Sequence, residues 1–243
     1  MSRGRLIATS GRVLRQLRHD PRTIALLLVV PVVLMSILAW ILTAAQFDQW
    51  APPLLGIFPL IVMFLVTSVA TLRERSSGTL ERLLTMPMSK PDFVLGYALA
   101  FGLLAIIQGL VVSAVCFGVL GLDVAGSAWL VVLVAVADGL LGTALGLFVS
   151  AFATTEFQAV QFMPAVLLPQ LLLCGLIVPR DEMPTVARWI SNIIPLSYSI
   201  SALQRVSGDA TVTWGFWVDL LVVAGFAIVL LLLGAATLRR RTP

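Results

Sequence analysis

The one carboxylate that lies well inside a long apolar run is Asp138. A charged side chain at the centre of a bilayer costs roughly 2.5–3.5 kcal/mol on insertion scales, so Asp138 is expected to face the interior of a helix bundle. There it could contact a substrate or carry a proton. It could instead make a hydrogen bond between helices, with Gln108 at similar depth as its partner, and we favour this structural role.

Two prolines, Pro164 and Pro169, lie five residues apart in a later apolar run, with Gln161 and Gln170 on either side of them. Proline kinks a membrane helix and frees backbone carbonyls. These residues could therefore shape the wall of a pathway or a moving helix, or they could give the helix a fixed curve.

Residues for independent catalysis are scarce. Lys90 is the single lysine and follows Ser89, so no G-x-x-x-x-G-K-[ST] phosphate-binding loop occurs in these 243 residues. His19 is the single histidine and precedes the first apolar run, which excludes a Ser-His-Asp triad within the membrane. No His, Cys, Asp or Glu cluster has metal-ligand spacing. We expect no catalytic residue, no metal site and no cofactor in the chain itself.

The composition indicates an all-α integral membrane protein. Hydrophobic residues make up 59% of the chain and charged residues 12%, with a mean hydropathy of +1.03. A soluble domain carries about twice that fraction of charge. The apolar runs exceed the roughly 20 residues that a spanning helix needs, and they lack the alternation of a barrel strand. Cys116 and Cys174 lie within such runs, where they are expected to pack in the core, although a disulfide stays open.

Six spans are expected in a single domain of residues 1–243. They cover about 23–45, 53–72, 93–120, 127–152, 157–178 and 216–238. The first run is too long for a signal peptide, so we expect a permanent anchor. Residues 1–22 mix arginines with Leu6, Val13, Leu14 and Leu17, which is typical of an amphipathic helix lying on an anionic membrane surface. Asp20 followed by Pro21 predicts the cap and first residue of the next helix.

The fourth run contains a stripe of small residues next to Asp138. They are spaced so that they share one helix face: Ala135, Gly139, Gly142 and Gly146. Small side chains let a second helix approach closely, so this face is expected at a helix–helix contact.

The positive charges predict the orientation. Thirteen of the 16 basic residues fall on one side of the six expected spans: in residues 1–22, in the segment 73–91 and at the C-terminus. The positive-inside rule places this side in the cytoplasm. Both termini are then cytoplasmic, as an even number of spans requires, and the clustered charge does not indicate nucleic acid.

The segment 179–215 is expected on the outer side. Residues 184–194 and the stretch after Pro195 each show an apolar stripe at helical spacing, and neither is long enough to span. A helical hairpin that dips into the outer leaflet fits this pattern, and a surface amphipathic helix is the alternative.

The charge-rich segment 73–91 reads as a cytoplasmic loop. Gly78 breaks the preceding helix, Thr79 can cap a short helix, and Pro87 ends that helix. Its apolar side chains then form one ridge: Leu80, Leu83 and Leu84. Such a ridge suits docking into a groove of another protein, although an ordinary solvated loop is also open.

The same segment resembles a motif of the ABC-2 type transporter permeases, E-R-E-x-G-T-L-E-x-L-L-x-x-P. The matching residues are Arg73, Glu74, Arg75, Gly78, Thr79, Leu80, Glu81, Leu83, Leu84 and Pro87. Longer forms of the motif have a glutamate where Thr71 stands. A looser match to an N-P-L-T-Y segment before the last span is formed by Pro195, Tyr198 and, further on, Arg205, with Ile194 in place of the asparagine.

The resemblance covers essentially the whole chain and implies a membrane subunit of an exporter. It implies two such permeases, as a homo- or heterodimer, with two ATP-binding subunits that bind ATP and Mg. The N-terminal helix and the segment 73–91 would contact the ATPase, and the outer hairpins would cover the exit. The substrate would be an amphipathic drug or lipid, with a polysaccharide as the alternative. An ion-coupled carrier and a membrane anchor for a regulatory ATPase also stay open.

Overall fold

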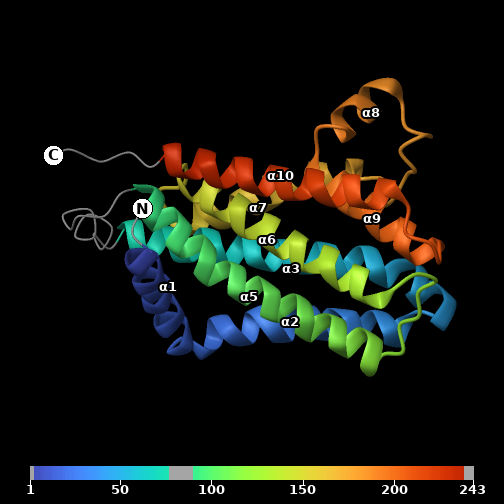
Figure 1. The fold of residues 1–243 in the computed structure, drawn as a ribbon, viewed down its shortest axis with the longest axis horizontal. Coiled ribbons are helices and arrows are strands. Elements are labelled where there is room, and N and C mark those ends of the chain that lie inside the picture. Colours follow the sequence, from blue (N-terminus) through green and yellow to red (C-terminus); the bar gives the residue numbers. More distant parts are fainter. Residues whose placement is uncertain (1–2, 77–89, 238–243) are drawn as a thin grey trace.

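The computed structural model describes residues 3–76 and 90–237, all of whose regular elements are helices. Long helices run side by side in one elongated bundle (Figure 1). They are α2 (Pro21–Ile41), α3 (Ala44–Ser76), α5 (Lys90–Gly118), α6 (Ala128–Ser150), α7 (Glu156–Leu173) and α10 (Trp214–Thr237). Three shorter helices complete the described chain: α1 (Arg3–Arg18), α8 (Thr185–Ser191) and α9 (Pro195–Gly208).

Five of the described helices are long and apolar enough to cross a membrane, namely α2, α3, α5, α6 and α10.

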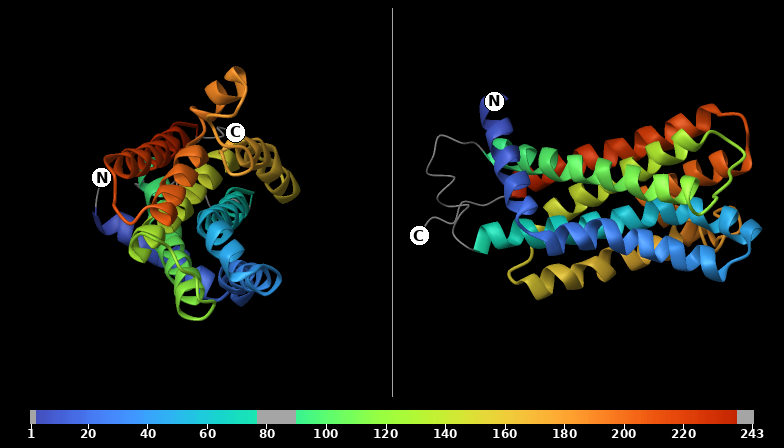
Figure 2. Two further views of the ribbon diagram at one scale, coloured as in Figure 1. Left: turned by 90° about the vertical axis from the view of Figure 1, so that its right-hand side faces the viewer. Right: turned by 90° about the horizontal axis from the view of Figure 1, so that it is seen from below.

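The expected span 157–178 corresponds to α7, which has 18 residues and three glutamines and ends five residues earlier than expected, at Leu173. At 1.5 Å per residue α7 is about 27 Å long, slightly less than the hydrocarbon core. Gly175, with a backbone φ of 91°, turns the chain after it. Even so, α7 runs lengthwise beside the other long helices (Figure 2).

Helix α3 is much longer than the expected span 53–72. It has 33 residues and includes residues 46–52, which separate the first two expected spans, and residues 73–76. Pro52 and Pro53 lie inside it rather than at its start. Both prolines are buried against neighbouring helices, so packing outweighs the loss of backbone hydrogen bonds.

Helix α6 is the centre of the bundle. It packs on α3, α5, α9 and α10, and it is the most buried of the five candidate spans. The stripe of small residues confirms the predicted close contact. A Cβ at Gly142 would lie 2.3 Å from the Leu60 carbonyl oxygen of α3, and one at Gly146 would lie 2.6 Å from that of Phe64. Glycine is therefore required for the backbones of α3 and α6 to approach this closely.

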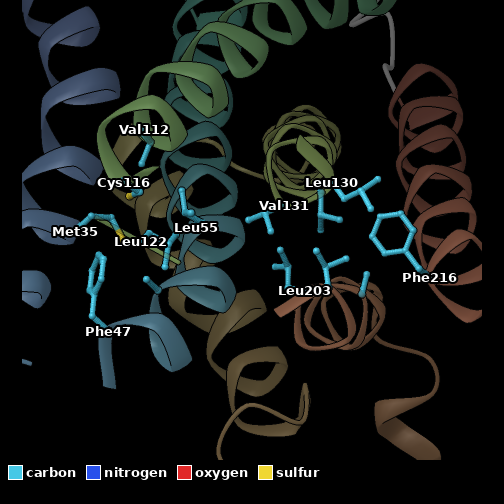
Figure 3. Packing of buried hydrophobic residues seen from close by; sticks show 14 residues of the cluster. Met35, Phe47, Leu55, Val112, Cys116, Leu122, Leu130, Val131, Leu203 and Phe216 are labelled. Carbon is cyan, nitrogen blue, oxygen red and sulfur yellow. The ribbon is translucent and has the colours of Figure 1, made fainter. Parts of the chain in front are cut away.

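The two ends of the bundle have different cores. At the end away from α1, Leu130 and Val131 of α6 face Leu203 of α9 and Phe216 of α10 (Figure 3). Cys116 belongs to this cluster and Cys174 to a neighbouring one, and both are free thiols. The cysteines therefore have the packing role that was expected.

At the other end α1 lies across the long helices (Figure 2). Its buried residues Val13 and Leu17 pack with Tyr97 of α5, and the Ser10 hydroxyl donates a hydrogen bond to the Gly96 carbonyl over 2.9 Å. The apolar face of α1 was expected to rest on the membrane surface. In the structure Val13 and Leu17 of this face cover the end of the protein core, whereas Ile7 is exposed. A glycine of α5 lets α1 cross it closely, and contact of α1 with a membrane stays a prediction.

Candidate functional site

The last turn of α3 carries Arg73, Glu74 and Arg75, the first part of the segment that was predicted to be a loop. That prediction was wrong for these three residues, which are helical. Arginine and glutamate favour helices, and each of the three side chains finds a partner on a different neighbour. The rest of the motif, from Gly78 to Pro87, lies outside the described residues.

Glu74 makes the most buried of these contacts. Its residue is only 6% exposed, and both carboxylate oxygens accept hydrogen bonds from Arg12 of α1 over 3.4 Å. Arg12 also donates to the Tyr97 hydroxyl of α5 over 2.9 Å. Glu74 is one of the motif residues of the segment 73–91, which was expected to contact an ATPase. In the structure Glu74 joins α1, α3 and α5, and its contact with an ATPase stays a prediction.

The two arginines connect α3 to the helices on its other side. Arg73 donates to both carboxylate oxygens of Glu156, at 2.8 and 3.0 Å, and so reaches the first residue of α7. Arg75 donates to the backbone carbonyls of Ser150 and Ala151 at the end of α6. A cation is favourable there because the last carbonyls of a helix carry partial negative charge.

Asp138 is fully buried in α6 and accepts a hydrogen bond from the Ser199 hydroxyl of α9. Its Oδ2 atom has no hydrogen-bond partner among the described residues, and a Cβ at Gly56 of α3 would lie 2.2 Å from it. The predicted bond to Gln108 is wrong. Both polar atoms of Gln108 are buried and without a partner in the described part of the chain. The carboxylate thus links α6 to α9, a helix that the apolar pattern alone did not place in the core.

The polar residues and prolines of α7 differ in their exposure, and none of them has a hydrogen bond to Asp138 among the described residues. Gln161 and Pro169 are exposed and Pro164 is half-buried, whereas Gln170 is buried and donates to the Val166 carbonyl of its own helix over 3.1 Å. Two cavities of about 750 and 610 Å³ open elsewhere, and neither is lined by these residues. Their place in a substrate pathway stays a prediction.

The segment 179–215 contains two helices separated before Pro195, as the apolar stripes predicted. The Tyr198 hydroxyl donates to the Asn192 carbonyl over 2.7 Å, and the Arg180 guanidinium lies 5.3 Å from the centre of the Tyr198 ring. Arg205 of α9 pairs with Asp219 of α10 at 3.1 Å. Most of one face of α9 is buried in the bundle, while α8 projects from it (Figure 1).

The elbow between α1 and α2 is fixed by Asp20, the predicted cap. Its carboxylate accepts hydrogen bonds from the Thr23 hydroxyl at 2.6 Å and the Thr23 amide at 3.2 Å. These bonds lower the pKa of Asp20, because they favour its ionised form.

Removing this cap gives a pH-dependent prediction. Asp20→Ala is expected to lower the free energy of unfolding by about 1 kcal/mol at neutral pH. Because the folded-state pKa is lowered, the carboxylate stabilises the fold above its unfolded-state value of 3.8. The advantage of the wild type is lost as the pH falls through the lower folded-state pKa. Thermal unfolding in detergent over a range of acidic pH measures it, and a difference that grows on acidification contradicts the prediction.

The model of one known family matches most of the chain. The family is described as ABC-2 type transporter, and the match covers residues 5–206. The chain belongs to this family.

Curated relatives of this ABC-2 chain are named as transporters or permeases. It is 28% identical over 177 residues to the inner membrane transport permease YhhJ of Escherichia coli, covering 70% of this chain and 47% of the relative. It is 30% identical over 142 residues to the probable multidrug ABC transporter permease YbhR of the same species, covering 58% and 38%. It is 26% identical over 196 residues to ABC transporter G family member 20 of Dictyostelium discoideum, covering 80% and 27%. The chain thus matches less than half of the length of these relatives.

Two ion-pair partners in this ABC-2 chain were not identified from its sequence, namely Arg12, the partner of Glu74, and Glu156, the partner of Arg73. Arg12 looked no different from the other arginines of the N-terminal segment, so nothing singled it out. Glu156 did have a signal. Thr155, whose side chain accepts from the Gln158 amide over 3.2 Å, precedes an acidic first turn, which is the pattern of a helix start.

Proposed function

We propose that this chain is the membrane-spanning subunit of an ATP-driven exporter. It would pair with a second permease, identical or not, and with two copies of an ATP-binding subunit that binds ATP and Mg. Membership of the ABC-2 family supports the exporter class. These residues contain no phosphate-binding loop, so under this proposal ATP is hydrolysed by a separate subunit.

The observation that carries the proposal is the anchoring of the α3 end. Residues 77–89 follow directly on a turn whose three charged side chains hold α1, α5, α6 and α7. A displacement of that segment by an ATPase would therefore be passed to several helices at once instead of bending α3 alone. We propose that the ridge Leu80, Leu83 and Leu84, with Glu81 beside it, docks on the ATPase.

The proposed topology has six passes, with α7 as the fifth, and both termini in the cytoplasm of a cell with the chain in its plasma membrane. The described chain begins and finishes at the same end of the bundle, where α3 ends and α5 begins (Figure 1). This arrangement needs an even number of lengthwise helices, which the five apolar spans plus α7 supply. The excess of arginine at this end favours the cytoplasmic side.

For the substrate we propose an amphipathic drug or lipid. Aromatic residues make up 8% of the chain and tyrosines number two, which disfavours the stacked aromatic surface that a sugar chain prefers. The printed name of the relative YbhR, a probable multidrug permease, agrees with this class. The α8–α9 segment would cover the exit at the opposite end of the bundle.

The docking ridge is tested by Leu83→Glu in the chain reconstituted with an ATP-binding subunit. A carboxylate in an apolar docking groove loses the burial of the leucine and is left without a partner, so we expect substrate-stimulated ATP hydrolysis and transport to fall at least about tenfold. Thr85→Glu is the control, because it adds the same charge off the expected ridge.

Two results would contradict the proposal. An equal loss of ATP hydrolysis and transport in Leu83→Glu and Thr85→Glu would mean that the added charge impairs coupling wherever it stands, and not that the leucine ridge docks. Transport by the chain alone under an ion gradient, without any ATP-binding subunit, would favour the ion-coupled carrier.

A further inference from the structure

The cavity of about 750 Å³ lies where α1 meets the bundle. Its walls come from α1, the elbow at residues 20–26, the last three turns of α3, the face of α5 that carries Tyr97, and the first turns of α7. No pathway residue predicted from the sequence contributes to it. It therefore needs an explanation apart from the proposed pathway.

The lining of this cavity changes from polar to apolar along the bundle. The charged residues stand on helix ends: Asp20 and Arg22 at the start of α2, Arg73 and Glu74 at the end of α3, and Glu156 at the start of α7. One turn or more further in, the same three helices contribute only apolar side chains, including Leu26, Val69 and Val160. A ligand that fills the whole cavity must have a polar head and an apolar continuation.

Most of the charges in the polar part are already paired. Glu74 is held by Arg12, and Glu156 is held by Arg73. Two opposite charges remain, and neither makes a salt bridge to a described residue: the Arg22 guanidinium, which is exposed, and the Asp20 carboxylate, which caps α2. Both residues line the cavity, so its lining offers one positive and one negative group that no described salt bridge neutralises, and the Asp20 carboxylate also feels the charge of Arg73.

We infer that this cavity binds one zwitterionic phospholipid of the surrounding membrane. Its phosphate lies at Arg22, its ammonium group at Asp20, and the first part of an acyl chain between Leu26, Val69 and Val160. Arginine suits a phosphate because its planar fork donates two hydrogen bonds at once. The carboxylate of Asp20 keeps free acceptor capacity beside its bonds to Thr23.

The position of the cavity agrees with this ligand. The apolar runs of α2 and α3 end here and the amphipathic helix α1 crosses them, which is the level at which lipid head groups lie. The buried residues Glu74 and Tyr97 also line the cavity, and both are hydrogen-bonded to Arg12, so the head group meets a fixed polar surface. The inference requires only that the chain spans a membrane, and it is independent of export and of any ATPase.

Native mass spectrometry of the purified, delipidated full chain tests the inference. Dioleoyl phosphatidylethanolamine, which is zwitterionic, is added in one series and dioleoyl phosphatidylglycerol, which is anionic, in another. We expect one tightly retained phosphatidylethanolamine per chain, bound about fivefold or more tightly than phosphatidylglycerol. Inorganic phosphate and glycerophosphoethanolamine, which lacks acyl chains, should not displace it.

Three variants locate the site. Arg22→Gln should lower the retention of phosphatidylethanolamine about fivefold or more, whereas Arg18→Gln, an equal change of charge on an exposed arginine of α1 outside the cavity, should not. Asp20→Asn keeps a good helix cap, so the protein should fold normally and lose only its preference for the zwitterionic lipid.

Several results would overturn the inference. Equal retention of the two lipids by the wild type would exclude a zwitterionic site. Equal effects of Arg22→Gln and Arg18→Gln would exclude this cavity. Displacement by millimolar inorganic phosphate would show a site for a free anion. The readout is binding alone, so failure here leaves the exporter proposal standing, and loss of ATPase coupling would leave the lipid site standing.

Discussion

Gly142→Ala is expected to destabilise the protein by about 3 kcal/mol, the upper end of the usual cost of overpacking. The added Cβ would lie 2.3 Å from the Leu60 carbonyl oxygen and 2.9 Å from the Leu60 Cα atom. Both atoms belong to the backbone of α3, so no side chain can rotate away, and α3 and α6 must separate along their most extensive contact. Thermal unfolding of the purified chain in detergent measures the loss.

Gly225→Ala in α10 is the matched control. A Cβ at this position meets no atom within 4 Å, and alanine favours a helix over glycine by roughly 0.5–1 kcal/mol. The same chemical change is thus expected to have opposite signs at the two positions. If both Gly142→Ala and Gly225→Ala stabilise the protein, the close approach of α3 and α6 does not require glycine at position 142.

Glu74→Gln is the second change with a large expected effect, about 2 kcal/mol in the free energy of unfolding. Glutamine nearly preserves the shape but removes the negative charge, which leaves the Arg12 guanidinium beside Tyr97 without its counterion. Because Arg12 is the polar link from α1 to α3, we expect faster hydrogen exchange of the α1 amides as well.

The exposed pair at the same end of the bundle provides the comparison. The side chains of Arg73 and Glu156 are 58% and 49% exposed, against 8% for Glu74, so Glu156→Gln should cost no more than about 1 kcal/mol. A double-mutant cycle of Arg12→Gln with Glu74→Gln then isolates the contact between these two side chains, which are 32% and 8% exposed. Equal costs for Glu74→Gln and Glu156→Gln would mean that burial does not strengthen this contact.

The features that the sequence predicted well are those set by local pattern. Asp20 and Pro21 begin α2, as the rules for caps and for the first helical position require. Gly142 and Gly146 lie against another helix because their spacing keeps them on one face, whichever helix supplies the contact. The family could also be recognised, since its motif is a run of residue types along the chain.

The sequence predicted least well where a helix ends, when contacts with distant residues decide whether the chain stays helical. The loop was expected to begin at Arg73, yet the charges of Arg73, Glu74 and Arg75 are satisfied by partners 62 to 83 residues away, so α3 continues. Polar residues at the end of a helix look the same in sequence whether water or a distant side chain solvates them.

By itself, the sequence determined the membrane class, the approximate positions of the long apolar helices, the cap of α2 and the small-residue face of α6, because each depends on residues close together in the chain. Only the tertiary structure decided that Asp138 bonds to Ser199 and not to Gln108, and that Glu74 turns inward to Arg12. The reason is that helix spacing fixes which face a side chain occupies, whereas the choice of neighbour depends on how closely two backbones approach. At Gly56, where there is no Cβ, α3 comes near enough to α6 to enclose the carboxylate, and this contact between distant segments has no local signature.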